Sequence, residues 1–148
     1  MVRRPEVIGV RPVDDGHEVV SVASDGSRYR LEPCRECPWR VDKVGGFPAE
    51  AFVQSARVAE DLATSTFGCH MTGTVRPATC AGFLAAGADH NLAVRRRVAA
   101  GQLDLDAVSD GGHELHAGYR TMAEANGVPA TDPALARCRA SHREAGHA

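Results

Sequence analysis

Residues 32–40 read "EPCRECPWR" and carry the most specific chemistry of the chain. They place Cys34 and Cys37 three positions apart, with a proline, a tryptophan and an arginine directly behind them. A gap of two residues lets one tight turn present both thiolates to a single metal ion. The same pair could exchange a disulfide, as in thioredoxin-like proteins, or pack as two small hydrophobic side chains. The other cysteines have to decide between these three interpretations.

Two further cysteines favour a metal site. Cys69 and Cys80 complete the spacing C-x2-C-x31-C-x10-C, and both lie in an irregular segment, residues 64–83, that contains several Gly and Thr residues and a Pro. Irregular segments can aim sulfur atoms inward, and hydrogen bonds from their free backbone N–H groups stabilise thiolates. Four thiolates suit either a tetrahedral zinc ion or an iron–sulfur cluster. We therefore predict a metal centre whose ligands are Cys34, Cys37, Cys69 and Cys80.

The spacing and the neighbouring aromatic residues bear on which metal is bound. The four cysteines form one close pair and two single residues, whereas zinc modules more often supply two tight pairs. Trp39, Phe67 and Phe83 lie within a few residues of the cysteines, and an apolar shell protects a cluster from solvent. These features favour an iron–sulfur cluster slightly over structural zinc, Zn2+.

A separate interpretation is needed for two residues near the cysteines, His70 and Arg40, and for the fifth cysteine, Cys138. His70 neighbours Cys69, so both cannot easily reach one ion, and a hydrogen bond to a thiolate or carbonyl is the preferred role for His70. A set of three cysteines and His70 stays open as an alternative. Arg40 can donate from its planar fork to sulfur or to a carbonyl oxygen. Cys138 lies far along the chain between two arginines, and we predict that it is not a ligand.

Hydrophobic patterning predicts an α+β domain, with an N-terminal β-hairpin or small antiparallel sheet followed by about four helices. Residues 6–10 form a candidate strand, and residues 17–32 resemble a hairpin whose turn lies at Asp25 and Gly26. Apolar residues at helical spacing and capping residues indicate the helices. The predicted helices span residues 48–63, 80–100, 113–127 and 131–146. We expect one metal-binding domain over residues 1–130 and a peripheral C-terminal helix or tail over 131–148.

The composition limits the core, the location and the partners. Hydrophobic residues make up 43% of the 148 positions but aromatic residues only 5%, which predicts a modest core built from Ala, Val and Leu. The net charge of −2 gives no general attraction to nucleic acid. There is no apolar run of membrane-spanning length and no secretory signal, so we expect a cytoplasmic protein without a membrane partner. Reduced cysteines in that compartment more often bind metal than form a disulfide framework.

Two other functions are consistent with the sequence. Arg95, Arg96 and Arg97 could bind phosphates, which would make the protein a zinc-stapled module for nucleic acid or a protein partner, although a solvated helix face explains the same run. A thiol redox role for Cys34 and Cys37 is weaker, because such pairs need a helix N-terminus and a βαβ context.

The sequence leaves open whether the protein is an enzyme. "HELH", residues 113–116, puts two histidines on one face of a predicted helix, but it lacks the H-E-x-x-H spacing of zinc proteases. Asp104 and Asp106 could bind a metal or simply belong to a loop. Neither pair includes a placed base or nucleophile, so no catalytic residue is assigned.

Four pieces of sequence, "PCRECPWR", "FPAEAF", "FGCH" and "CAGF", occur in this order between residues 33 and 83. Together they resemble a family of short, uncharacterised proteins from high-GC bacteria and their phages that is defined only as a domain of unknown function. The resemblance covers about residues 33–98, with "HNLAVRR" as its last piece. It implies that Cys34, Cys37, Cys69, His70 and Cys80 are the signature positions, and it implies no activity.

Overall fold

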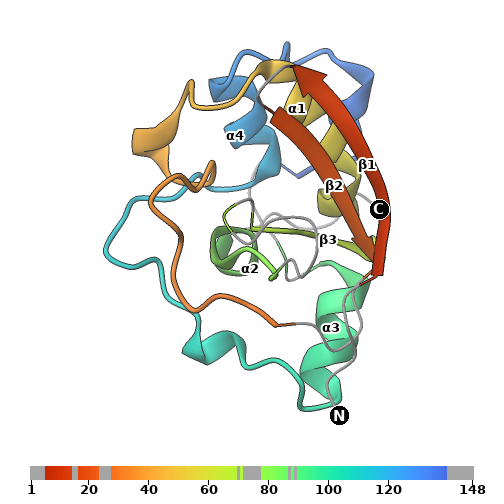
Figure 1. Ribbon diagram of the computed structural model, residues 1–148, viewed down its shortest axis with the longest axis vertical. Coiled ribbons are helices and arrows are strands. Elements are labelled where there is room, and N and C mark those ends of the chain that lie inside the picture. The colour runs from red at the N-terminus through yellow and green to blue at the C-terminus, as the bar shows by residue number, and fades with distance from the viewer. Residues whose placement is uncertain are drawn as a thin grey trace.

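The computed structural model describes residues 6–14, 17–23, 28–69, 71, 78–86, 88 and 90–139, with side chains from residue 28 onward (Figure 1). This part of the chain contains three strands and four α-helices, and helical residues outnumber strand residues. The elements are, in chain order, β1 (Glu6–Asp14), β2 (His17–Ala23), α1 (Ala49–Ser55), β3 (Ser65–Phe67), α2 (Ala81–Ala86), α3 (Leu92–Ala99) and α4 (Tyr119–Ala125). Short 3-10 helices occupy Val41–Lys43, Ala56–Ala59, Leu105–Ala107 and Pro133–Leu135.

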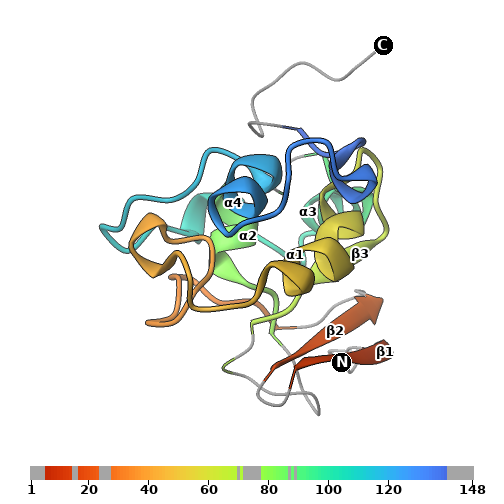
Figure 2. The same ribbon diagram turned by 90° about the horizontal axis from the view of Figure 1, so that it is seen from above.

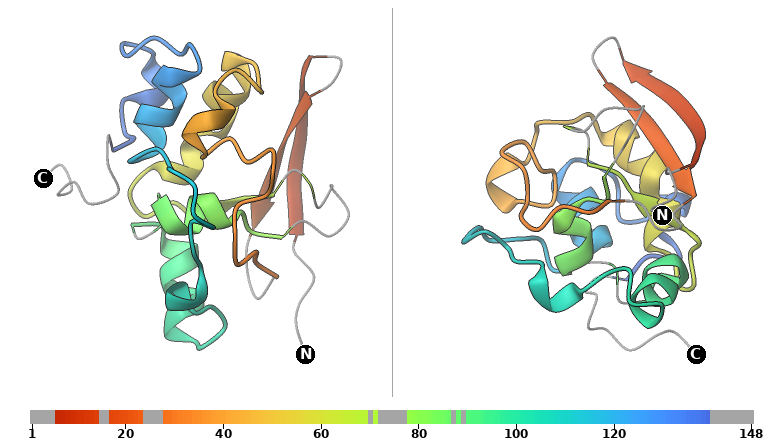
Figure 3. Two further views of the ribbon diagram at one scale, coloured as in Figure 1. Left: turned by 90° about the vertical axis from the view of Figure 1, so that its left-hand side faces the viewer. Right: turned by 60° about the horizontal axis from the view of Figure 1, so that its bottom comes forward.

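The strands form a sheet in the order β1-β2-β3, with both neighbouring pairs antiparallel. The hairpin of β1 and β2 lies on one side of the molecule and the helices lie on the other, as two views show (Figures 2 and 3). Pro12 is tolerated because β1 is an edge strand, where a missing N–H breaks no inner ladder. Helix α1 packs against β2.

The hairpin differs from the predicted one. The sequence pattern placed it at residues 17–32, but β2 pairs with β1 on one side and with β3 on the other. The expected return strand around Tyr29 instead forms a parallel bridge to Thr79, and residues 24–27 lie outside the described part. Alternation along a sequence shows that a segment is extended, but it does not select the partner strand.

The first two predicted helices are interrupted. The helix expected over 48–63 ends as an α-helix at Ser55 and continues as a 3-10 turn to Ala59. The helix expected over 80–100 is two helices, α2 and α3, because the side chain of Asn91 accepts a hydrogen bond from the backbone N–H of Val94 and starts a new helix. The described residues contain four α-helices, which confirms the predicted number of about four, but most of the predicted boundaries differ from those of the structure.

The C-terminal third also departs from prediction. Helix α4 starts at Tyr119 rather than at residue 113, and it ends as predicted, before Gly127 with φ +98°. The peripheral helix expected from residue 131 is a single 3-10 turn in its described part, which ends at residue 139. Leu135 and Cys138 in this segment are buried, because they pack beside α1 and the 3-10 turn that follows it. No helix among the described residues is long and apolar enough to cross a membrane.

The centre of the core is aromatic. The Trp39 side chain is fully buried, and its ring centroid lies 5.9 Å from Phe67, 6.2 Å from Phe83 and 5.9 Å from Tyr119. Edge and tilted contacts of this kind stabilise a core beyond the area that they bury. Four of the seven aromatic residues are therefore concentrated at one place, directly behind the cysteine pair.

Asn91 offers a test of how the helices are held. Its side-chain amide donates to the carbonyls of Val58 and Ser65 at 3.0 and 2.7 Å in addition to capping α3. Asn91→Ala should lower the free energy of unfolding by about 3 kcal/mol, because it removes the cap and leaves two buried carbonyls without donors. Urea unfolding measures this loss. Asn126→Ala, which alters the half-buried end of α4, is the control and should cost about 1 kcal/mol or less.

Candidate functional site

The first cysteine pair lies on a tight turn. The backbone N–H of Cys37 donates to the carbonyl of Cys34 at 3.1 Å, and that of Arg40 donates to Cys37 at 3.1 Å, so two turns follow each other. Each sulfur also accepts a backbone N–H from the residue two positions ahead, Glu36 for Cys34 and Trp39 for Cys37. Such bonds favour the thiolate form. Both cysteines are buried, and we call this segment, residues 34–40, the cysteine turn.

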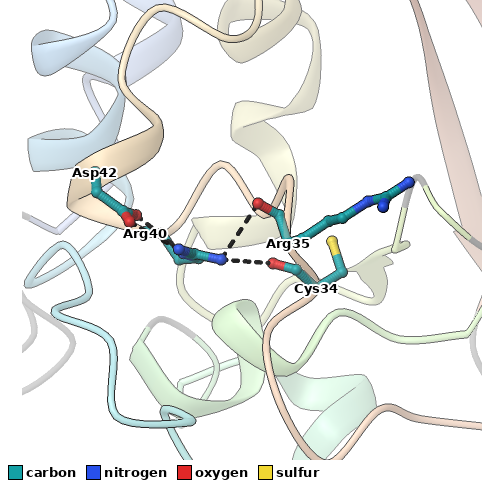
Figure 4. Close-up of polar contacts among 4 residues, drawn as sticks. All are labelled: Cys34, Arg35, Arg40 and Asp42. Carbon is teal, nitrogen blue, oxygen red and sulfur yellow. Dashed lines mark hydrogen bonds and ion pairs between the residues drawn. The ribbon is translucent and has the colours of Figure 1, made fainter.

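Arg40 holds the cysteine turn in place (Figure 4). Its Nη1 donates to the carbonyl oxygens of Cys34 and Arg35 at 3.4 and 3.2 Å. Its Nε and Nη2 donate to the two carboxylate oxygens of Asp42 at 2.9 and 2.7 Å. The Arg40 guanidinium accordingly keeps the pKa of Asp42 below its usual range. Of the two roles that the sequence allowed, the structure shows bonds to carbonyls.

Cys69 and Cys80 come from two paired segments. The backbone N–H of Cys69 donates to Ala78 at 2.7 Å and that of Cys80 donates to Phe67 at 2.8 Å, around a bridge between Gly68 and Thr79. Side chains alternate between the faces of paired strands, so Phe67, Cys69, Ala78 and Cys80 share one face. This pairing brings Cys69 and Cys80 together although ten residues separate them in the chain.

The four cysteines lie next to one another. The sulfur atoms of Cys37 and Cys80 are 3.7 Å apart, and hydrogen-bonding contacts between thiols also join Cys34 to Cys37 and Cys34 to Cys69. Cys69 further accepts the backbone N–H of Met71. No group of three or more His, Cys, Asp or Glu side chains with the geometry of a metal site is found among the described residues. We call these four residues the cysteine cluster.

Crowding and burial act on the thiols. The pKa of Cys69 is raised, first by its contact with Cys34 and then by burial. The pKa of Cys34 is raised chiefly by its contact with Cys37. For Cys37 the contact with Cys34 lowers the pKa, but the contact with Cys80 and burial raise it by more. Neighbouring sulfurs cannot all become anionic without a cation to balance them.

Gly82 permits the closest approach in the cluster. A Cβ atom at this position would lie 2.6 Å from Trp39 Cβ and 2.8 Å from the Cys37 sulfur. Helix α2 can therefore seat directly on the cysteine turn only because residue 82 has no side chain. This gives a physical reason for the glycine in "CAGF".

The remaining predicted site residues, except His70, lie in the described part of the chain. His70 lies outside the described residues, so its role stays a prediction. Arg95 and Arg96 are exposed on α3, but Arg97 is buried, donates to the Thr79 hydroxyl at 3.1 Å and lies over the Tyr29 ring. Asp104 and Asp106 are exposed around a 3-10 turn, where Asp104 accepts the backbone N–H of Asp106.

Cys138 is separate from the cysteine cluster. Its thiol donates to the carbonyl of Ala56 at 3.4 Å, and burial raises its pKa to about 12. The charges that act on it are those of Glu60 and Arg120, and no other cysteine is among them. Cys138 therefore has surroundings different from those of the other four cysteines, and that it is not a ligand stays a prediction.

The sequence reasoning missed two contributors to the site. Residues 113–116 were expected on a helix, but Leu115 bridges to Arg40 and the backbone N–H of His116 donates to the Trp39 carbonyl at 2.9 Å. This segment therefore braces the end of the cysteine turn, and the two histidines are not on one helix face. Arg30 was not singled out either, although its charge acts on Cys69. Only the partner strands, which a single sequence does not specify, place these residues here.

The fold and the cluster define a small protein whose helices and paired strands pack around four buried cysteines. Residues 29–139 match a family described as a family of unknown function, DUF6283, and the chain belongs to this family. The resemblance seen in the sequence is thereby confirmed, but it extends past residue 98, so that Cys138 falls inside the family region. No curated protein and no solved structure matches the chain.

Gly82 supplies a test of the packing in the cluster. Gly82→Ala should destabilise the protein by about 2 kcal/mol, because the overpacking penalty exceeds the gain in helix propensity. Thermal unfolding checks the result. Ala85→Ser, at a half-buried position of the same helix, is the control and should change the stability by less than about 1 kcal/mol. An unchanged Gly82→Ala protein would contradict the close contact.

Proposed function

We propose that this protein binds a metal through Cys34, Cys37, Cys69 and Cys80. The observation that carries the proposal is the convergence of four buried cysteines from two separate parts of the chain onto one place. Four neutral thiols have no need to meet in this way, whereas a cation that replaces their protons would draw four thiolates together. Metal binding is the chemistry that these residue types share.

The sulfur spacing supports a single tetrahedral ion, with zinc as its occupant. A Zn–S bond of about 2.3 Å puts two sulfurs of a tetrahedron about 3.8 Å apart. Cys37 and Cys80 are separated by 3.7 Å. This distance favours zinc, whereas the sequence slightly favoured an iron–sulfur cluster.

An iron–sulfur cluster is the second candidate. The Trp39 and Phe83 side chains are fully buried, and Phe67 contacts both rings, so the cysteines have an apolar cover on one side. The backbone N–H groups that bond to three of the sulfurs would also tune a cluster's reduction potential. Both features support a cluster as well as they support zinc.

A thiol redox function has less support than either metal. Reactive cysteines are partly exposed and have lowered pKa values. Here Cys34 and Cys37 are buried, and the pKa values of both are raised. A binding module for a polyanion also has less support, because only Arg95 and Arg96 of the arginine run are exposed.

Loss of one ligand should empty the site. Cys34→Ser and Cys80→Ser should each remove about one equivalent of metal per chain, since a lost thiolate disrupts a structural four-ligand site. Both should lower the melting temperature by about 10 °C, because the binding free energy of the metal is part of the folding free energy. Cys138→Ser is the matched control and should keep its metal. Parent-like melting of the first two variants speaks against a structural metal.

The metal itself is identified by purification without oxygen, followed by iron, sulfide and zinc analysis and a visible spectrum. The expected result is a colourless protein with one zinc per chain and no sulfide. A brown protein whose visible absorption bleaches on reduction would establish the iron–sulfur cluster instead. A folded parent protein that holds neither metal, even after anaerobic incubation with zinc or with iron and sulfide, would overturn the proposal.

A further inference from the structure

Arg30 lies on the same face as the cysteine cluster. Its backbone N–H donates to the Thr79 carbonyl at 3.0 Å, and Thr79 donates to Arg28 at 2.9 Å, which makes Tyr29 the parallel partner of Thr79. Residues on either side of a paired residue point to the opposite face, so Arg30 shares its face with Cys69 and Cys80.

The other face of the same pairing confirms this assignment. Tyr29 and Thr79 face α3, where the Arg97 guanidinium lies 5.9 Å from the Tyr29 ring centroid and bonds to the Thr79 hydroxyl. Tyr29 and Thr79 thus point away from the cysteines, and the residues that flank them point toward the cysteines.

The Arg30 side chain carries an unmet hydrogen-bonding need. Its Nε atom is buried and has no hydrogen-bond partner among the described residues. Leaving a buried donor unpaired is costly, and more so for a charged group. Arg40 differs from Arg30, because its guanidinium is balanced by Asp42 and bonded to two carbonyls. Arg30 itself is half-buried, but its buried Nε–H donor faces the cysteine cluster without a partner, which indicates an acceptor with more negative charge than a neutral thiol.

We propose that Arg30 supplies compensating positive charge, and its Nε–H donor, to the Cys69 side of a metal centre of four thiolates. Four thiolates around one divalent ion carry a net charge of about −2. Arg30 would then be a positioning residue that stabilises the loaded site without binding the ion. The inference rests on the proposed function. The sign of the electrostatic effect on Cys69 agrees with this role. Cys34 and burial raise the pKa of Cys69, whereas the positive charge of Arg30 lowers it.

The test is titration of the reduced, metal-free protein with Co2+, whose visible spectrum reports sulfur ligation, in competition with a chelator. Arg30→Gln should weaken Co2+ binding about 10- to 100-fold while the spectrum of four-sulfur ligation is retained, as is typical when a group that supports a ligand is lost. Arg30→Lys keeps the charge and should recover most of the affinity. Arg95→Gln, an exposed arginine on α3, is the control and should bind like the parent.

Each outcome has a distinct meaning. Equal affinity of the parent and Arg30→Gln, within about twofold, overturns the role of Arg30 and leaves the metal centre standing. Equal weakening in Arg30→Gln and Arg30→Lys overturns charge compensation. If Arg30→Gln fails to fold by circular dichroism, Arg30→Lys decides, since near-parental affinity supports the charge and a tenfold loss contradicts it. A folded parent that binds no Co2+ overturns the proposed function and this inference together.

Discussion

The contact of α2 with the cysteine turn is the constraint on which the rest of the structure depends. Gly82 lies against Cys37 and Trp39 with no room for a methyl group. The same contact brings Cys80, which directly precedes α2, within 3.7 Å of Cys37, and it sets Phe83 against Trp39. Cluster and core are therefore one packed unit, and neither can be repacked without the other.

Two arginines organise this unit in different ways. Arg40 is neutralised by Asp42 and holds the turn through carbonyl oxygens, so it fixes shape. Arg30 lies in a separate segment, its buried Nε has no partner among the described residues, and its positive charge acts on Cys69. Arg97 is buried like Arg40, and it contacts Tyr29 and Thr79 on the opposite face. Arginine in this chain builds the interior as well as the surface.

Local signals in the sequence predicted local features well. The tight turn of the cysteine pair, the start of α1 near residue 48 and the end of α4 before Gly127 all follow from residues within one or two turns of each other. The errors arose where a distant partner decides. Tyr29 pairs with Thr79 rather than with β2, residues 113–116 brace Trp39 rather than forming a helix, and Arg97 is buried by its neighbours across the strands. Periodicity specifies what a segment is but not what it meets.

The ring contact between Trp39 and Tyr119 joins two residues that are far apart in the chain. During synthesis, at about 5–20 residues per second, Trp39 is added to the chain on the order of ten seconds before Tyr119. Contacts of such long sequence separation also form slowly once the whole chain is available. The cysteine turn can therefore gain the contacts of Trp39 with Phe67 and Phe83 first, and the Tyr119 ring completes its aromatic cover last.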